Sequence, residues 1–320
     1  MLRFVAIGLA VLVGGAGVAS AQTYPDRAIT ILVGAGAGGG TDVQTRIMID
    51  KLADRLGQRI IVENRAGAGG NIAQAAVARA APDGYTLIMM PPAQAINHTL
   101  YATPGYDMIK DFKGIAMWAQ SPLLFVVNPK LPPNTLKELV DYSKANANKL
   151  NYGNGIGFIN AMVMELFKVE TGASIQFVPY GGMAQARTDT ISGQIETTVD
   201  SIASSGPYVE NGQLKGLAVT SKERLPRFPN LPTVAEAGYP SLTRSTWYGL
   251  VGPAGLPDAI AQKLAREIAA VQADPDVIKK IEASGAYPFV MGPAETTKFI
   301  ADETATWAKV IETNKLEKVK

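Results

Sequence analysis

A glycine-rich stretch near the start of the chain is the segment best suited to bind a ligand. It covers Val33–Asp42, follows the apolar run Ile29–Val33 and leads into an amphipathic run. This order predicts a strand, a loop and the start of a helix. Backbone N–H groups at a helix start point outward, and the helix dipole favours negative charge there. We therefore predict that an anion binds the backbone of Gly38, Gly39, Gly40 and Thr41.

The same stretch also matches a dinucleotide-binding loop. Gly34, Gly36 and Gly39 have the spacing G-x-G-x-x-G, and Glu63 follows the next strand-like run, where such folds carry a ribose-binding acid. Two features argue against a nicotinamide or flavin: the glycines continue through Gly40, and an export signal precedes the loop. We expect no cofactor, and an oxidoreductase that binds a nucleotide through these glycines is the enzymatic alternative.

Residues 1–21 have the pattern of a secretory signal peptide. Arg3 supplies positive charge, Phe4–Val18 is apolar, and Ala19-Ser20-Ala21 forms an A-x-A cleavage site. We expect the mature chain to begin near Gln22 and to reside in the periplasm; an uncleaved N-terminal anchor is the alternative. No further run of about 18 apolar residues follows, so we expect the mature chain to be soluble.

Composition argues against several classes of function. The chain has 320 residues, of which 47% are hydrophobic, a formal net charge of +2 and no cysteine. This length favours two lobes, and the mixed charges without a basic stripe argue against nucleic acid as a partner. The only histidine, His98, has no accompanying G-x-S-x-G elbow, and we interpret it as a surface or loop-packing residue. We expect no catalytic residue and no metal site, although a carboxylate pair assembled by the fold stays open.

Strand and helix patterns alternate along most of the chain, which is typical of an α/β fold with parallel strands covered by helices. The last third is helical, and Trp307 lies on the apolar stripe of its final helix, which predicts a core position. Loops follow the carboxyl ends of the strands, where open α/β sheets bind ligands. We therefore expect two lobes that close over a solute. The expected strands are Ile29–Val33, Ile60–Val62, Tyr85–Met90, Leu123–Val127, Ile175–Val178, Ile195–Val199 and Leu214–Val219.

A series of short motifs follows in order along the mature chain. They are Tyr24-Pro25-Asp26-Arg27, Gly38–Asp42, Val62–Asn71, Ala81–Leu87, Val178–Gly182, Leu217–Ser221 and Leu231–Gly238. With these motifs in this order, the mature chain resembles, nearly end to end, the Bug (Bordetella uptake) or TctC-type receptors of tripartite tricarboxylate transporters.

This resemblance implies a type II periplasmic-binding-protein fold with two α/β lobes around a ligand cleft. The first lobe would comprise residues 22–124 plus 249–320 and the second residues 125–248, with crossings near Phe125–Asn128 and Trp247–Val251. Family members bind small carboxylates, often dicarboxylates or aromatic acids, without chemistry, and hand them to membrane permease subunits. We expect a monomer with this role. An exported ligand sensor for a membrane kinase is the alternative, because the sequence does not separate transport from sensing.

Carried over position by position, the resemblance places ligand contacts on both lobes. The glycine loop before the first helix would hold one carboxylate through backbone N–H groups and bound waters, and a loop of the second lobe would hold the distal end. In the first lobe the contact residues are Gly38, Gly39, Gly40, Thr41 and Asp42, together with Ala93, Gln94 and Asn97 in the loop after the third strand. In the second lobe they are Gly155, Gly157, Phe158, Tyr180, Gly181 and Asp200.

Several of these residues have a structural alternative. The glycines could serve only their turns, and Tyr180 could cover the edge of the sheet. Asp42 would repel an anionic ligand, so we expect it to cap its own helix. Asp200 could bind a ligand's ammonium or hydroxyl group, or could cap the helix that begins at Ser201.

Two departures from the family pattern bear on ligand choice. The family usually has Pro-Phe-Pro-Pro or similar before Gly38–Asp42, whereas this chain has Gly34-Ala35-Gly36-Ala37. The second-lobe loop usually carries serines and a histidine after its glycine, whereas this chain has Phe158 directly after Gly157. We predict that Phe158 contacts the apolar body of the ligand while the backbone of Gly39–Thr41 binds a carboxylate. The alternative places Phe158 in the core of its own lobe.

Overall fold

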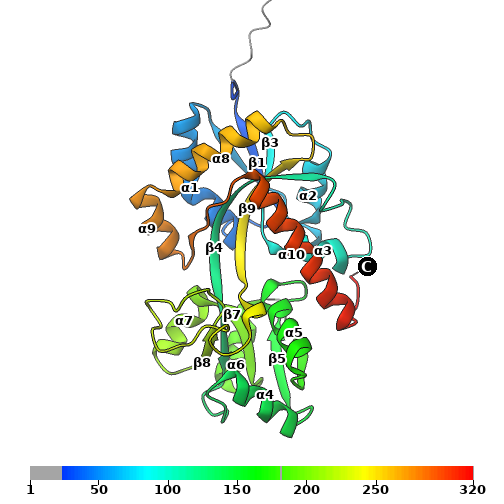
Figure 1. The fold of residues 1–320 in the computed structure, drawn as a ribbon, viewed down its shortest axis with the longest axis vertical. Coiled ribbons are helices and arrows are strands. Elements are labelled where there is room, and N and C mark those ends of the chain that lie inside the picture. The colour runs from blue at the N-terminus through cyan, green and yellow to red at the C-terminus, as the bar shows by residue number, and fades with distance from the viewer. Residues whose placement is uncertain (1–23, 181, 320) are drawn as a thin grey trace, which may run out of the picture.

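Two lobes lie one above the other in the computed structural model, which describes residues 24–180 and 182–319. Figure 1 shows the first lobe at the top, built from the beginning and the end of the chain, and the second lobe at the bottom, built from its middle. The predicted signal peptide, residues 1–21, and the predicted site residue Gly181 lie outside the described residues. Among the described residues, no helix combines the length and the apolar character needed to cross a membrane.

Ten strands carry the two lobes. They are β1 (Ile29–Val33), β2 (Ile60–Asn64), β3 (Thr86–Met90), β4 (Phe112–Val127), β5 (Leu150–Asn154), β6 (Ile175–Pro179), β7 (Thr197–Ser201), β8 (Lys215–Val219), β9 (Ser245–Pro253) and β10 (Tyr287–Pro288) among the residues described.

Helices connect and cover these strands. They are α1 (Gly40–Leu56), α2 (Asn71–Ala78), α3 (Pro92–Leu100), α4 (Leu136–Ala145), α5 (Ile159–Thr171), α6 (Met183–Ser192), α7 (Ile202–Glu210), α8 (Asp258–Gln272), α9 (Pro275–Ala283) and α10 (Pro293–Thr313), with short 3-10 turns η1 (Ala68–Gly70) and η2 (Pro240–Leu242).

Strand β4 joins the lobes because its two parts pair with different strands. Residues 112–122 pair antiparallel with β9, whereas residues 123–127 pair antiparallel with β7 and β8. The strand order is β2-β1-β3-β9-β4 in the first lobe and β4-β7-β5-β6 in the second, with β8 and β10 also paired to β4. We propose from this change of partner that the lobes meet near Pro122–Leu123, a few residues before the crossing expected at Phe125–Asn128.

Both faces of the first-lobe sheet are covered by helices. One core contains side chains of α1, α8 and α9, and the other contains side chains of α2, α3 and α10. Trp307 of α10 is fully buried, which confirms its predicted core position. Neighbouring residues of β9 belong to different cores: Trp247 packs on the α10 side and Tyr248 on the α1 side, because successive side chains of a strand point to opposite faces.

Two segments differ from the expectation based on sequence. The pattern predicts a strand only from Leu123, whereas β4 begins at Phe112, because shifts in the pairing with β9 after Gly114 and Met117 disrupt the two-residue period. The residues expected in a loop after the third strand lie in helix α3 instead. Pro92 stands in the first turn of α3, where its missing N–H costs no hydrogen bond.

Candidate functional site: a cleft between the lobes

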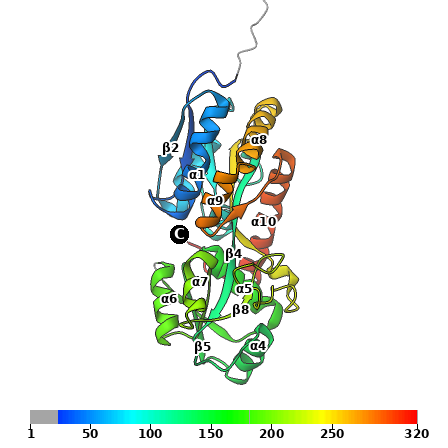
Figure 2. The same cartoon turned by 90° about the vertical axis from the view of Figure 1, so that its left-hand side faces the viewer.

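The carboxyl ends of strands from both lobes point toward the junction between them. Strands β1 and β3 run toward the second lobe, because β3 is antiparallel to β9 and β9 leaves the junction at Ser245. Strands β5 and β7 run toward the first lobe, because β7 is antiparallel to β4. Helices α1 and α3 therefore begin opposite α5, α6 and α7, and Figure 2 shows α1 above α6 and α7 on the same side of β4. We call the space between these helix starts the cleft.

The start of α1 offers backbone donors to the cleft. Its N-cap is Gly39, which has no side chain to accept from the helix, and the first bond back to the loop runs from Val43 N to Gly39 O at 2.9 Å. The N–H groups of Gly40, Thr41 and Asp42 precede that bond, so the helix itself contains no acceptor for them. A Cβ on Gly40 would lie 3.2 Å from the hydroxyl of Tyr248, which places that hydroxyl beside these donors.

Asp42 stabilises the loop before its own helix. Its carboxylate accepts from the backbone N–H of Gly38 at 2.9 Å, from Arg46 Nε at 2.9 Å and from Asn64 Nδ2 at 3.0 Å. Burial opposes its charge, but these three donors together hold the pKa of Asp42 below its ordinary value. The expectation that Asp42 caps its own helix is therefore wrong: the N-cap is Gly39, and the Asp42 carboxylate bonds instead to the loop before the helix, at Gly38.

Gln94 and Asn97 of α3 hold the neighbouring glycine turn, Gly67–Gly70, by hydrogen bonds. Both side-chain amides donate to Gly69 O, at 2.9 and 3.1 Å, and both residues are buried. Gly70 has a φ of +93°, and a Cβ there would lie 2.2 Å from Gln94 Nε2. Ala93, on the same helix, is half-buried. This arrangement gives Gln94 and Asn97 a structural role at the cleft, whatever they contribute to the ligand.

Gly34 of the dinucleotide-like pattern and the nearby Gly38 have structural reasons to be glycine, whereas Gly36 lies in open space. A Cβ on Gly34 would lie 2.9 Å from Gly70 Cα, so Gly34 permits two backbones to approach closely. Gly38 has a φ of +78°, a left-handed conformation that favours glycine. The turn therefore requires glycine at these positions without any bound nucleotide.

Residues 155–158 form the second-lobe side of the cleft. Phe158 is the N-cap of α5, and its side chain supplies no capping bond. Its side chain is 42% exposed, and a Cβ on Gly155 would lie 2.7 Å from its ring, so the ring covers Gly155 and does not enter the core. Gly157, with a φ of +74°, approaches the other lobe: a Cβ there would lie 3.1 Å from Leu100 Cδ2.

Tyr180 packs on its own lobe. A Cβ on Gly153 of β5 would lie 2.5 Å from the Tyr180 ring, and the hydroxyl donates to Asp189 of α6 at 2.8 Å. Burial, together with the bond to the Asp189 carboxylate, raises the pKa of Tyr180 to about 12. These contacts place the ring of Tyr180 over β5, an inner strand next to the edge strand β6, and not only at the sheet edge named in the alternative.

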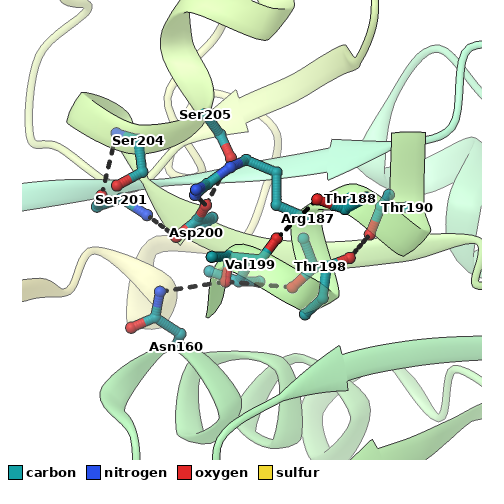
Figure 3. Close-up of polar contacts among 12 residues, drawn as sticks. Asn160, Arg187, Thr188, Thr190, Thr198, Val199, Asp200, Ser201, Ser204 and Ser205 are labelled. Carbon is teal, nitrogen blue, oxygen red and sulfur yellow. Dashed lines mark hydrogen bonds and ion pairs between the residues drawn. The ribbon is translucent and has the colours of Figure 1, made fainter. Parts of the chain in front are cut away.

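Asp200 forms a buried ion pair that the sequence did not indicate. It is 2% exposed, and its carboxylate accepts from Arg187 Nη1 at 2.7 Å, from Ser205 Oγ at 2.7 Å and from Ser201 N at 2.8 Å. Figure 3 shows Arg187 reaching across to Asp200, with Ser201 and Ser205 beside it. The cap of α7 is supplied by Ser201, which accepts from Ser204 N at 3.2 Å. Asp200 therefore holds Arg187 and the end of β7 at the edge of the cleft.

Two residues near the cleft were missed by sequence reasoning. Arg187 lies thirteen positions before Asp200 and carried no local signal, since only the packing of α6 against β7 brings them together. Tyr248 belongs to a strand whose pairing across the junction the sequence did not reveal. Burial raises the pKa of Tyr248 to about 12, so its hydroxyl stays protonated and can donate at neutral pH. His98 accepts from Met108 N at 3.4 Å, a loop-packing contact as expected.

Comparison with known proteins identifies relatives across nearly the whole chain. Residues 44–316 match the TctC family, the tripartite tricarboxylate transporter family receptor. BugT of Bordetella pertussis is 35% identical over 317 residues, which cover 97% of each chain.

Solved structures resemble the fold as well. Rpa4515 of R. palustris, with adipate, is 34% identical with a TM-score of 0.77, covering 92% of this chain and 100% of the other. MatC of Rhodopseudomonas palustris, with bound malate, is 29% identical with a TM-score of 0.72, covering 90% and 100%. A TctC solute-binding protein from Polaromonas, without ligand, is 27% identical with a TM-score of 0.80, covering 91% and 100%. The expected two-lobed periplasmic-binding-protein fold is thereby confirmed, and the chain belongs to the TctC family of solute receptors.

Proposed function

We propose that the protein, in the periplasm, binds a small carboxylate with an apolar body in the cleft. The ligand would be a dicarboxylate or an aromatic acid, which the protein delivers to membrane permease subunits. Closure of the lobes would complete the site, and no chemical step is involved. Relatives with adipate and with malate support the ligand class.

One observation carries the proposal: helix starts from both lobes face each other without side-chain caps. The N-caps of α1, α5 and α6 are Gly39, Phe158 and Gly182, and none of them supplies a capping bond. Backbone N–H groups left without an acceptor at a helix start attract anions, and the helix dipoles add to this attraction. A dicarboxylate could bind one helix start with each end.

The apolar body of the ligand would lie against Phe158. An exposed aromatic at the start of α5 gives the second lobe a surface that a short polar acid cannot use. The tyrosine hydroxyl of Tyr248, beside Gly40, supplies a further donor for a carboxylate in the first lobe. We therefore rank adipate-like acids above malate-like acids as ligands.

A substitution that gives the N-cap of α1 a capping side chain tests the proposal. In Gly39→Ser the hydroxyl would accept from the first turn of α1 and compete with the ligand carboxylate; its Cβ would sit 3.1 Å from Gly36 O, so the exposed loop must shift slightly. We expect adipate affinity, measured by calorimetry, to fall about tenfold, the worth of one charge-assisted hydrogen bond.

The matched control is Gly292→Ser at the N-cap of α10, which begins outside the cleft. It should bind adipate like the unmodified protein and keep or raise the melting temperature. Equal affinity in Gly39→Ser and the unmodified protein would overturn the proposed site. Uptake of labelled adipate by cells with the permease subunits, with and without this protein, tests delivery.

A further inference from the structure

A second cavity lies at the hinge between the lobes. It has a volume of about 290 Å³, and its lining includes Gln120, Pro122, Lys222, Arg244, Trp247 and Phe289. We call it the rear cavity. Residues of both crossover segments line it, Pro122 of β4 and Ser245 at the start of β9, so a molecule bound there would contact both lobes.

The rear cavity and the cleft lie on opposite sides of the hinge strands. Trp247 lines the rear cavity, whereas the hydroxyl of its neighbour Tyr248 lies beside Gly40 at the start of α1. Successive residues of β9 point to opposite faces, so the two sites cannot share a wall at this strand. Figure 2 agrees: α10 and the yellow segment before β9 lie on the side of β4 away from α6.

Aromatic rings form the inner wall of the rear cavity. Phe299 contacts Trp247 edge to face with ring centres 5.5 Å apart, and it contacts Phe289 in the same way at 5.5 Å. Phe289 and Phe299 are half-buried at the cavity, whereas Trp247 is fully buried behind them. Such a wall favours a flat apolar body, which gains both burial and aromatic contacts.

A fixed arginine supplies the charge. Arg244 donates through Nη1 to Glu303 at 2.6 Å and through Nε to Ser241 O at 3.1 Å, and within the described residues no acceptor contacts Nη2. Glu303 is 3% exposed and its carboxylate also accepts from the indoles of Trp247 and Trp307, at 3.0 and 3.1 Å. The buried carboxylate therefore fixes the guanidinium at the cavity wall, while its own acceptor positions are already used.

A second cation stands at the rim. Lys222 is exposed, lines the cavity and has no carboxylate partner among the described residues. Arg244, Lys222 and the single saturated Glu303 leave a net positive charge around an aromatic wall. Because Nε and Nη1 of Arg244 already donate to Ser241 and Glu303, Nη2 is the nitrogen left for a ligand carboxylate. A guanidinium that is already fixed costs little ordering on binding.

We propose that the rear cavity is a second ligand site, which binds a small organic acid with one carboxylate and a flat apolar body. The carboxylate lies between Arg244 and Lys222, and the flat body lies against Phe289 and Phe299. This site differs from the cleft in chemistry, because side chains bind the anion here, whereas backbone helix starts bind it in the cleft.

Fluorine NMR of the mature protein with 4-fluorobenzoate tests the proposal. We expect saturable binding that Thr243→Phe, which fills the cavity, weakens at least about tenfold, the effect of losing one well-filled apolar contact. Lys222→Gln should weaken binding by about twofold to threefold, as expected for one exposed charge. Saturating adipate keeps the cleft occupied throughout, because the cleft is proposed to accept aromatic acids as well. Under this condition Lys279→Gln, which removes an exposed charge from α9, and Gly39→Ser, which alters the cleft, should leave the binding of 4-fluorobenzoate unchanged.

The variants also separate this site from the cleft. Thermal unfolding of each variant checks that it is folded, and Lys222→Gln changes only a surface side chain. Binding that survives Thr243→Phe but is lost in Gly39→Ser would place 4-fluorobenzoate in the cleft and overturn the proposal. Absence of saturable binding to the unmodified protein would overturn it as well, without affecting the outcome for adipate.

Discussion

The two sides of the cleft hold their helix starts by different means. In the first lobe, an aspartate bonds to the backbone of its own loop, at Gly38, and the ligand would meet backbone groups of glycines. In the second lobe, the buried Asp200 holds the half-buried Arg187, and the exposed Phe158 stands at the start of α5. Backbone donors recognise a carboxylate without regard to the rest of the molecule, whereas side chains differ in size and polarity. The comparison suggests that the first lobe binds charge and the second lobe sets ligand choice.

The largest effect is expected where the second lobe has its buried charge. Asp200→Ala leaves the Arg187 guanidinium, 16% exposed, without its carboxylate, and we expect a loss of about 3–5 kcal/mol in the free energy of unfolding. Urea denaturation measures it. The matched control is Glu210→Ala, which breaks the exposed pair with Arg227 and should cost about 1 kcal/mol or less. Equal losses in both variants would mean that Arg187 rearranges toward solvent.

The next effect concerns ligand choice. Phe158→Ser should weaken adipate binding by about 1.5–3 kcal/mol, or one to two decades, and malate binding far less, because only the longer apolar body contacts the ring. Calorimetric titration with both acids measures this difference. Since Phe158 is 42% exposed, its loss should change the melting temperature of the free protein little. Similar weakening of both acids would assign ligand choice to other residues.

The smallest effect is the pH dependence of the first-lobe loop. The pKa of Asp42 lies below its ordinary value of 3.8, so its contribution to stability is fully present above that value and is lost as the pH falls through the lowered pKa. Unfolding free energies of the unmodified protein and Asp42→Asn should differ by about 1 kcal/mol at neutral pH. Below about pH 4 the difference should shrink. A difference independent of pH would indicate that Asp42 acts through shape alone.

Much of the fold could be predicted because period and turn residues agree along the chain. The segment Ile29–Val33 is predicted with the bounds that β1 has, and Trp307 is predicted on the apolar stripe of the final helix, where it is buried in α10. The first part of β4 was not predicted from sequence, because shifts in its register with β9 break the alternation of side chains. Helix α3 was not predicted because Pro91 stands at its N-cap and Pro92 in its first turn, and two consecutive prolines are more typical of a loop.

Less of the candidate site than of the fold could be predicted from the sequence. Glycines mark the helix starts, and the structure explains several of them by close backbone approach. The Arg187–Asp200 pair and the Arg244–Glu303 pair join residues from separate elements, so no local spacing reveals them. The sequence left two roles for Asp200 open. One of its carboxylate oxygens accepts from Arg187 and Ser205, and the other accepts from the backbone N–H of Ser201. Its contact with a ligand stays a prediction.

The late position of β9 in the chain has a consequence for biogenesis. This strand lies between β3 and β4 in the first-lobe sheet, yet about 120 residues separate it from the end of β4 along the chain. Until β9 is in place, β3 and the first part of β4 present unpaired edges, and such edges invite pairing with other chains. The second lobe can form from a continuous middle segment, whereas the first must wait for a distant one. Newly made chains would therefore be most vulnerable to aggregation in the lobe that carries the glycine loop.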